Sequence, residues 1–226
     1  MSRLGSWLWN IAMFIGIIML VVPIHEFGHY LAALALSVHP TQFSVGFGPE
    51  LVGITDGAGT RWSLAAIPLG GYVALPTLDQ APVLDQFLIL LAGPAFNVLY
   101  LLAIGLYMRA RGADWSFPTE HRGFLFVPFL RMSGRAGSLG LSAFVWYSAV
   151  VSLELAFFNV LPIFPLDGGK MFFLLAQNMM GLTVNDMALT VIGIVLAIFV
   201  VIPVVLPILQ KGRNFLNVDE ISPFSR

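Results

Sequence analysis

Four long apolar stretches constrain this chain more than any other feature of its sequence. They cover residues 8–38, 84–108, 141–180 and 184–209, and each is long enough to cross about 30 Å of hydrocarbon as a helix. Only 10% of the residues are charged, whereas a soluble domain carries about a quarter. The sequence therefore predicts an all-α polytopic membrane protein with about four transmembrane helices, formed by a single domain over residues 1–226.

Composition also narrows the ligands and partners of the chain. The formal net charge is -1 and there is no cysteine, so we expect no nucleic-acid surface, no disulfide and no thiolate metal site. The first apolar stretch follows Arg3, as in a secretory signal, but it is about twice as long as the usual signal core. We therefore interpret it as a retained span in contact with the lipid bilayer.

The first stretch contains the motif His25-Glu26-Phe27-Gly28-His29. Residues four apart lie on one face of a helix, so the two histidines can bind one metal ion together. Glu26 would then lie beside the metal as a general base toward water. The alternative is a hydrogen-bonded polar pair in the core. We favour the metal site because ionisable groups inside a membrane span are costly and usually functional.

The third stretch offers two acids as a further metal ligand, Glu154 and Asp167. Asp167 follows two prolines that break the helix, and its alternative role is a simple N-cap. In a four-span layout, spans one and three run in the same direction. His25 and Asn159 are 17 and 18 residues from the starts of their spans, at a similar depth of about 25–27 Å, and Glu154 would lie about 7 Å shallower. We therefore expect Asp167 as the ligand and Asn159 as a substrate or oxyanion contact.

The segment between the first two spans predicts a glycine-rich β element over residues 43–73. It is too apolar for an ordinary loop and too short to span, so we expect it to re-enter the membrane face. A plain extramembrane hairpin is the alternative. Residues 60–73 would supply an edge strand to which an unwound substrate adds, next to Gly70 and Gly71.

Two other segments carry weaker signals. In the second stretch, Gly93 permits close helix approach, and Asn97 offers either an interhelical hydrogen bond or a direct contact with substrate. The connection over residues 109–140 shows no clear periodicity, and we interpret its five arginines as a solvated surface facing lipid headgroups.

Together these motifs resemble the site-2 protease family of intramembrane zinc metalloproteases. Residues 25–29 match its HExGH motif and residues 159–169 match its second signature, NxxPxxPLDGG. Residues 43–73 are similar to the membrane-reentrant β-loop, and residues 93–97 to the second-span motif, of the bacterial branch that degrades anti-sigma factors. The PDZ domain usual in that branch has no counterpart in the short connection between spans two and three.

The resemblance implies one Zn²⁺ ion held by His25, His29 and Asp167, with Glu26 as catalytic base. It implies hydrolysis of peptide bonds within transmembrane protein substrates, as in regulated intramembrane proteolysis, with an upstream protease that pre-trims the substrate as a candidate partner. A catalytically silent membrane binding or chaperone-like protein of the same fold is the alternative, and a metal or proton transporter that also uses Glu154 is a third.

The resemblance also implies a location in the cell membrane, which is the inner membrane in a Gram-negative bacterium. It places the active site toward the cytoplasm. The charge distribution argues for the opposite orientation, since nine of the 11 Lys and Arg residues lie in the N-terminus, in the connection over residues 109–140 and in the C-terminal tail. We follow the resemblance, because the motif match is more specific than a charge count.

Overall fold

The computed structural model describes residues 2–112 and 126–181. In chain order its elements are α1 (Arg3–Ala35), β1 (Gln42–Thr55), β2 (Arg61–Ala74), the 3-10 helix η1 (Leu78–Gln80), α2 (Val83–Ala110), α3 (Phe126–Ser138), α4 (Leu141–Val160) and α5 (Asp167–Met180). The chain divides into two compact units, Met1–Leu161 and Pro162–Arg226. The first unit therefore holds the described elements from α1 to α4, and α5 belongs to the second.

Three of the described helices are long and apolar enough to cross a membrane: Leu4–Ala35, Val83–Ala110 and Leu141–Val160. They confirm a mostly helical membrane chain and correspond to the first three predicted spans. The third predicted stretch, residues 141–180, with its expected break at the two prolines, corresponds to α4, which ends at Val160, followed by the separate helix α5. Pro162 and Pro165 lie between the two helices, where their missing N–H groups prevent helix continuation. The fourth predicted span, residues 184–209, lies outside the described residues.

The connection over residues 109–140 contains a helix that the sequence did not predict. One face of α3 is buried through Leu130, Ser133 and Ala136, while Arg131 and Arg135 are exposed. This face packs against the N-terminal half of α1, where the indole Nε1 of Trp9 donates to the carbonyl of Gly134 at 2.9 Å. Glycine and serine lower the helix propensity of this segment. The sequence therefore shows no clear sign of a short amphipathic helix here.

The β element is confirmed as a small sheet of two strands, while its re-entry into the membrane face stays a prediction. The two strands pair with each other in three registers. Residues 42–45 pair with residues 61–64 in parallel, and on their other side they pair with residues 71–74 in the antiparallel sense. Residues 50–55 pair antiparallel with residues 61–65. The middle of the sheet is therefore residues 42–45 and 61–65, and its edges are residues 50–55 and 71–74. The expectation of an edge strand over residues 60–73 is wrong for its first half, because that half has strand neighbours on both sides.

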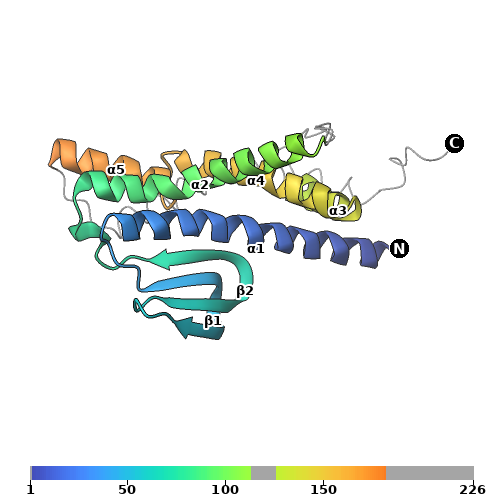
Figure 1. The fold of residues 1–226 in the computed structure, drawn as a ribbon, viewed down its shortest axis with the longest axis horizontal. Helices are drawn as coiled ribbons and strands as arrows, with labels where there is room; N and C mark the ends of the chain where they lie inside the picture. Colours follow the sequence, from blue (N-terminus) through green and yellow to red (C-terminus); the bar gives the residue numbers. More distant parts are fainter. Residues whose placement is uncertain (1, 113–125, 182–226) are drawn as a thin grey trace, which may run out of the picture. The chain divides into compact units, whose positions relative to one another are not determined.

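Aromatic side chains join the sheet to the C-terminal half of α1. The rings of Phe43 and Trp62 stack with centroids 4.7 Å apart, and Tyr30 of α1 meets Trp62 edge-on at 4.9 Å. The sheet lies along one side of α1 (Figure 1). On another part of α1, Ile17 and Val21 form a fully buried cluster with residues of α3 and α4. Between helices that span a membrane, such a cluster stabilises the fold by close van der Waals packing, because lipid is as apolar as the buried side chains.

Candidate metal site

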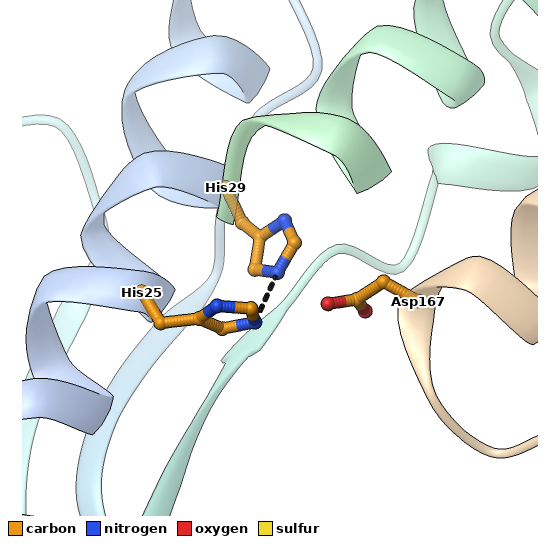
Figure 2. A group of neighbouring side chains, drawn as sticks. All are labelled: His25, His29 and Asp167. Carbon is orange, nitrogen blue, oxygen red and sulfur yellow. Dashed lines mark hydrogen bonds between the residues drawn. The ribbon is translucent and has the colours of Figure 1, made fainter. Parts of the chain in front are cut away.

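Two imidazoles converge on one face of α1. The Nε2 atoms of His25 and His29 are 3.2 Å apart, and the two residues are only 5% and 7% exposed (Figure 2). Two imidazole nitrogens at about 2.0–2.1 Å from one tetrahedral zinc ion would be about 3.3 Å from each other. The separation of the histidine pair therefore fits two ligands of a single zinc ion.

Helix α2 contacts both histidines through residues spaced four apart, which lie on one face of a helix. The carbonyl oxygen of Ile89 is 2.7 Å from His29 Nδ1, and Asn97 Nδ2 is 3.1 Å from His25 Nδ1. Between them lies Gly93, where a Cβ atom would be 2.3 Å from His29 Nε2 and 2.8 Å from His25 Cε1. Any side chain at Gly93 would therefore fill the space in which the imidazoles converge.

Glu26 lies next to the sheet edge formed by residues 71–74. A Cβ atom at Gly71 would be 3.6 Å from Glu26 Cγ and 3.5 Å from Val22 Cγ1, both on α1. Gly70 lies close to Phe47 instead, and a Cβ atom at Gly70 would be 2.2 Å from the ring of Phe47. The structure therefore brings Gly71 to the side chain of Glu26, and it places Gly70 beside an aromatic ring.

Two further predicted site residues, Asn159 and Asp167, are both buried. Asn159, on α4 of the first unit, is 9% exposed, and its Nδ2 donates to the carbonyl of Leu155 at 3.1 Å. Asp167 is the first residue of α5 in the second unit, is 6% exposed, and lies 3.5 Å from Lys170 Nζ through Oδ1. Figure 2 draws Asp167 together with the two histidines. A substrate contact for Asn159, Asn97, Gly70 and Gly71 stays a prediction.

Sequence reasoning assigned no site role to Gly93 or Ile89. A signal for both was nevertheless available, because Ile89, Gly93 and Asn97 repeat the four-residue spacing of His25 and His29. Two helices that each present a face with this spacing can meet along it. Only the structure shows that these two faces meet.

Comparison with known proteins gives one family for most of the chain. The model of Peptidase family M50 matches residues 13–112 and 121–203, more than half of the chain. A Brucella suis protein whose name is "Putative zinc metalloprotease" is 41% identical in an alignment that covers 40% of this chain and 30% of that protein. A protein of the same description from Rickettsia conorii is 42% identical in an alignment that covers 42% of this chain and 30% of that protein. The chain thus spans less than a third of the length of these curated relatives.

Proposed function

The chain belongs to Peptidase family M50, and from this premise we propose that it is an intramembrane zinc metalloendopeptidase. It hydrolyses peptide bonds within the transmembrane segments of membrane proteins embedded in the same lipid bilayer, as in regulated intramembrane proteolysis. An upstream protease that pre-trims the substrate fits this role. The observation that carries the proposal is the buried histidine pair, 3.2 Å apart, with Glu26 beside it in a helix able to span a membrane.

The metal ligands and Glu26 have separate roles in the proposed hydrolysis. His25 and His29 would hold a zinc ion, which would supply polarisation of the scissile carbonyl and a lower pKa for the attacking water. Glu26 accepts the proton of the attacking water and passes it to the nitrogen of the leaving amine. His25 and His29 are buried, so their imidazoles meet little competing solvent. Two facts support a third ligand from Asp167: its place in the motif over residues 159–169 and its burial at the start of α5.

The sheet edge over residues 71–74 presents the substrate. This edge has no strand partner on its outer side among the residues that the structure describes. A peptide within a helix has its amides paired inside its own segment, so the substrate must unwind before its carbonyl is attackable. An unwound segment that adds to this edge exchanges those lost hydrogen bonds for new ones. Because Gly71 lies against Glu26, the added segment runs beside the catalytic carboxylate.

The test is cleavage of a model transmembrane helix by the purified protein in lipid vesicles. We expect cleavage with zinc bound, loss of cleavage on chelation, and its recovery when zinc is restored. Glu26→Gln keeps the shape of the side chain but removes the base, so we expect zinc to stay bound while cleavage stops. Stoichiometric zinc without cleavage of any helix would support the catalytically silent alternative, and metal flux across the vesicles would support a transporter.

We further propose that the site lies toward the cytoplasm. Gly57 is exposed in the turn between β1 and β2, and Arg111 is exposed at the far end of α2. The chain has no cysteine of its own. In the Gly57→Cys and Arg111→Cys proteins, the introduced cysteine is therefore the single thiol that a maleimide can label. In intact cells an impermeant maleimide should label the Arg111→Cys protein alone. Labelling of the Gly57→Cys protein alone would reverse the orientation in favour of the charge distribution.

A further inference from the structure

We propose that Asn97 is a positioning residue of the metal site: its side-chain oxygen accepts the Nδ1 proton of His25 and so leaves the Nε2 lone pair of His25 for the metal. The inference rests on the proposed metal site, but not on the proposal that the protein cleaves peptides. It follows from the hydrogen bonds that join α2 to the histidine pair.

The tautomer of His29 is fixed by Ile89. A backbone carbonyl only accepts hydrogen bonds, so at 2.7 Å from Ile89 O the Nδ1 atom of His29 carries the proton. In a neutral imidazole the other nitrogen then has the lone pair. His29 Nε2 is therefore available as a metal ligand.

The tautomer of His25 depends on how the Asn97 amide is turned. As oriented in the structure, Asn97 Nδ2 donates to His25 Nδ1 at 3.1 Å. The proton of a neutral His25 is then on Nε2, from which it donates to His29 Nε2 at 3.2 Å. An imidazole protonated at Nε2 has no lone pair there for a metal. In this amide orientation, a metal could not bind both Nε2 atoms.

One polar atom of the Asn97 amide has no partner in either orientation. Asn97 is fully buried, and its Oδ1 atom has no hydrogen-bond partner among the described residues. The amide nitrogen would be equally unsatisfied at that place, so this cost of about 1–3 kcal/mol does not choose between the two orientations. The lone pairs that a metal needs do choose between them. The oxygen and nitrogen of an amide are nearly identical in shape, so a half turn exchanges them within the same space. After the turn, Oδ1 accepts from His25 Nδ1–H, and both Nε2 lone pairs face each other across the space beside Gly93.

Helix α4 also contacts Asn97, through the backbone of that residue. The Ser152 hydroxyl donates to the backbone carbonyl of Asn97 at 3.2 Å. Both histidines thus have a fixed outer partner on α2, a carbonyl for His29 and an amide for His25. In metalloproteins, loss of such an outer partner typically weakens metal binding or activity by about 10–100-fold.

The test compares three variants by zinc affinity, measured by competition with a chromophoric chelator on the purified protein. Asn97→Leu has a similar size and no acceptor, and we expect zinc affinity to fall by about 10–100-fold. Asn97→Asp keeps an acceptor at the same place, and its affinity should equal or exceed that of the unmodified protein. The control is Tyr100→Phe, which removes the 2.9 Å bond from Tyr100 to Ser148 at the same α2–α4 interface and should leave zinc affinity unchanged.

Two results would overturn the proposal: unchanged zinc affinity in Asn97→Leu, or an equal loss in Asn97→Asp and Asn97→Leu. Because a variant at a buried position can fail to fold, the nitrogen NMR shifts of His25 in the zinc-loaded, unmodified protein give a second measurement. They should show a protonated Nδ1 and a metal-bound Nε2, and the reverse would refute the role of Asn97. Zinc bound but no peptide cleaved would contradict the proposed function and leave this inference standing. No zinc binding at all would overturn both.

Discussion

Gly28 approaches Ala92 so closely that a Cβ atom at Gly28 would lie 2.4 Å from the carbonyl oxygen of Ala92. A contact of this length to rigid backbone cannot be relieved by turning a side chain. The missing side chain at Gly28 therefore sets the separation of α1 and α2 between the two histidines. The outer hydrogen bonds of His25 and His29 to α2 depend on this separation.

Replacement of Gly28 by alanine should therefore damage the metal site. We expect Gly28→Ala to destabilise the protein by about 1–3 kcal/mol, the usual cost of overpacking, and to weaken zinc binding as α2 moves away. Gly16→Ala is the control on the same helix, since its Cβ atom would meet only the ring of Phe144 at 3.3 Å. Thermal unfolding and zinc content of both purified variants give the comparison, and equal zinc affinity in the two would contradict this role of Gly28.

The identity of the third ligand can be tested by exchanging the two acids separately. Asp167→Ala should lose zinc affinity and cleavage together, because it removes a ligand. Glu154→Gln should keep zinc and at least part of the cleavage, since Glu154 lies on α4 more than three turns before Asp167 in sequence. Zinc content of the two purified variants decides the matter. A zinc-free Glu154→Gln beside a zinc-loaded Asp167→Ala would exchange the two assignments.

The sheet edge beside Glu26 can be obstructed at Gly71. A Cβ atom there would lie 2.7 Å from Ser44 O as well as against Glu26, so Gly71→Ala must shift the edge strand. Because a misplacement of about 1 Å can cost about 100-fold in rate, we expect kcat/KM to fall by up to about 100-fold, with zinc still bound. Gly57→Ala, in the exposed turn with no atom within 4 Å of the added Cβ, should cleave normally. Normal cleavage by Gly71→Ala as well would exclude this edge as the substrate site.

The turn between β1 and β2 should respond to acid. Trp62 Nε1 donates to Asp56 Oδ2 at 2.8 Å, and with the amides of Thr60 and Ala58 on Oδ1 it holds the pKa of the Asp56 carboxyl below its usual 3.8. A lowered pKa stabilises the fold above pH 3.8, and this stabilisation is lost as the pH falls through the folded value. The protection of the Thr60 amide against exchange, relative to an unstructured peptide at the same pH, should therefore fall in that acid range. In Asp56→Asn this protection should be lower at neutral pH and should not change further in acid, and an unchanged profile would remove Asp56 from this role.

The sequence alone predicted the residues whose chemistry depends on local spacing. His25 and His29 are four apart on one helix, so their convergence required no knowledge of the fold. The break after α4 and a new helix near Asp167 were both marked by the two prolines, which cannot continue a helix. The role of Gly93 depends on which face of α2 meets α1, and residue spacing alone does not determine that.

The β element shows the same limit. Alternation and turn residues predicted two strands, but nothing local indicated that residues 42–45 and 61–65 would each pair on both sides. Strand register is specified by packing across the sheet, here by Phe43 and Trp62 against Tyr30. The predicted edge was therefore placed partly on residues that lie in the middle of the sheet.

The triple pairing of β1 with β2 makes the sheet a single cooperative unit. Each strand holds both a middle and an edge segment, so neither edge can separate without loosening a strand that the other edge also needs. Regions of this kind open together, so their hydrogen-bonded amides report one common free energy of opening. In the proposed function, the edge beside Glu26 would consequently be a preformed template rather than a flap. A substrate segment that docked there would gain strand hydrogen bonds without first bearing the entropy cost of ordering the sheet.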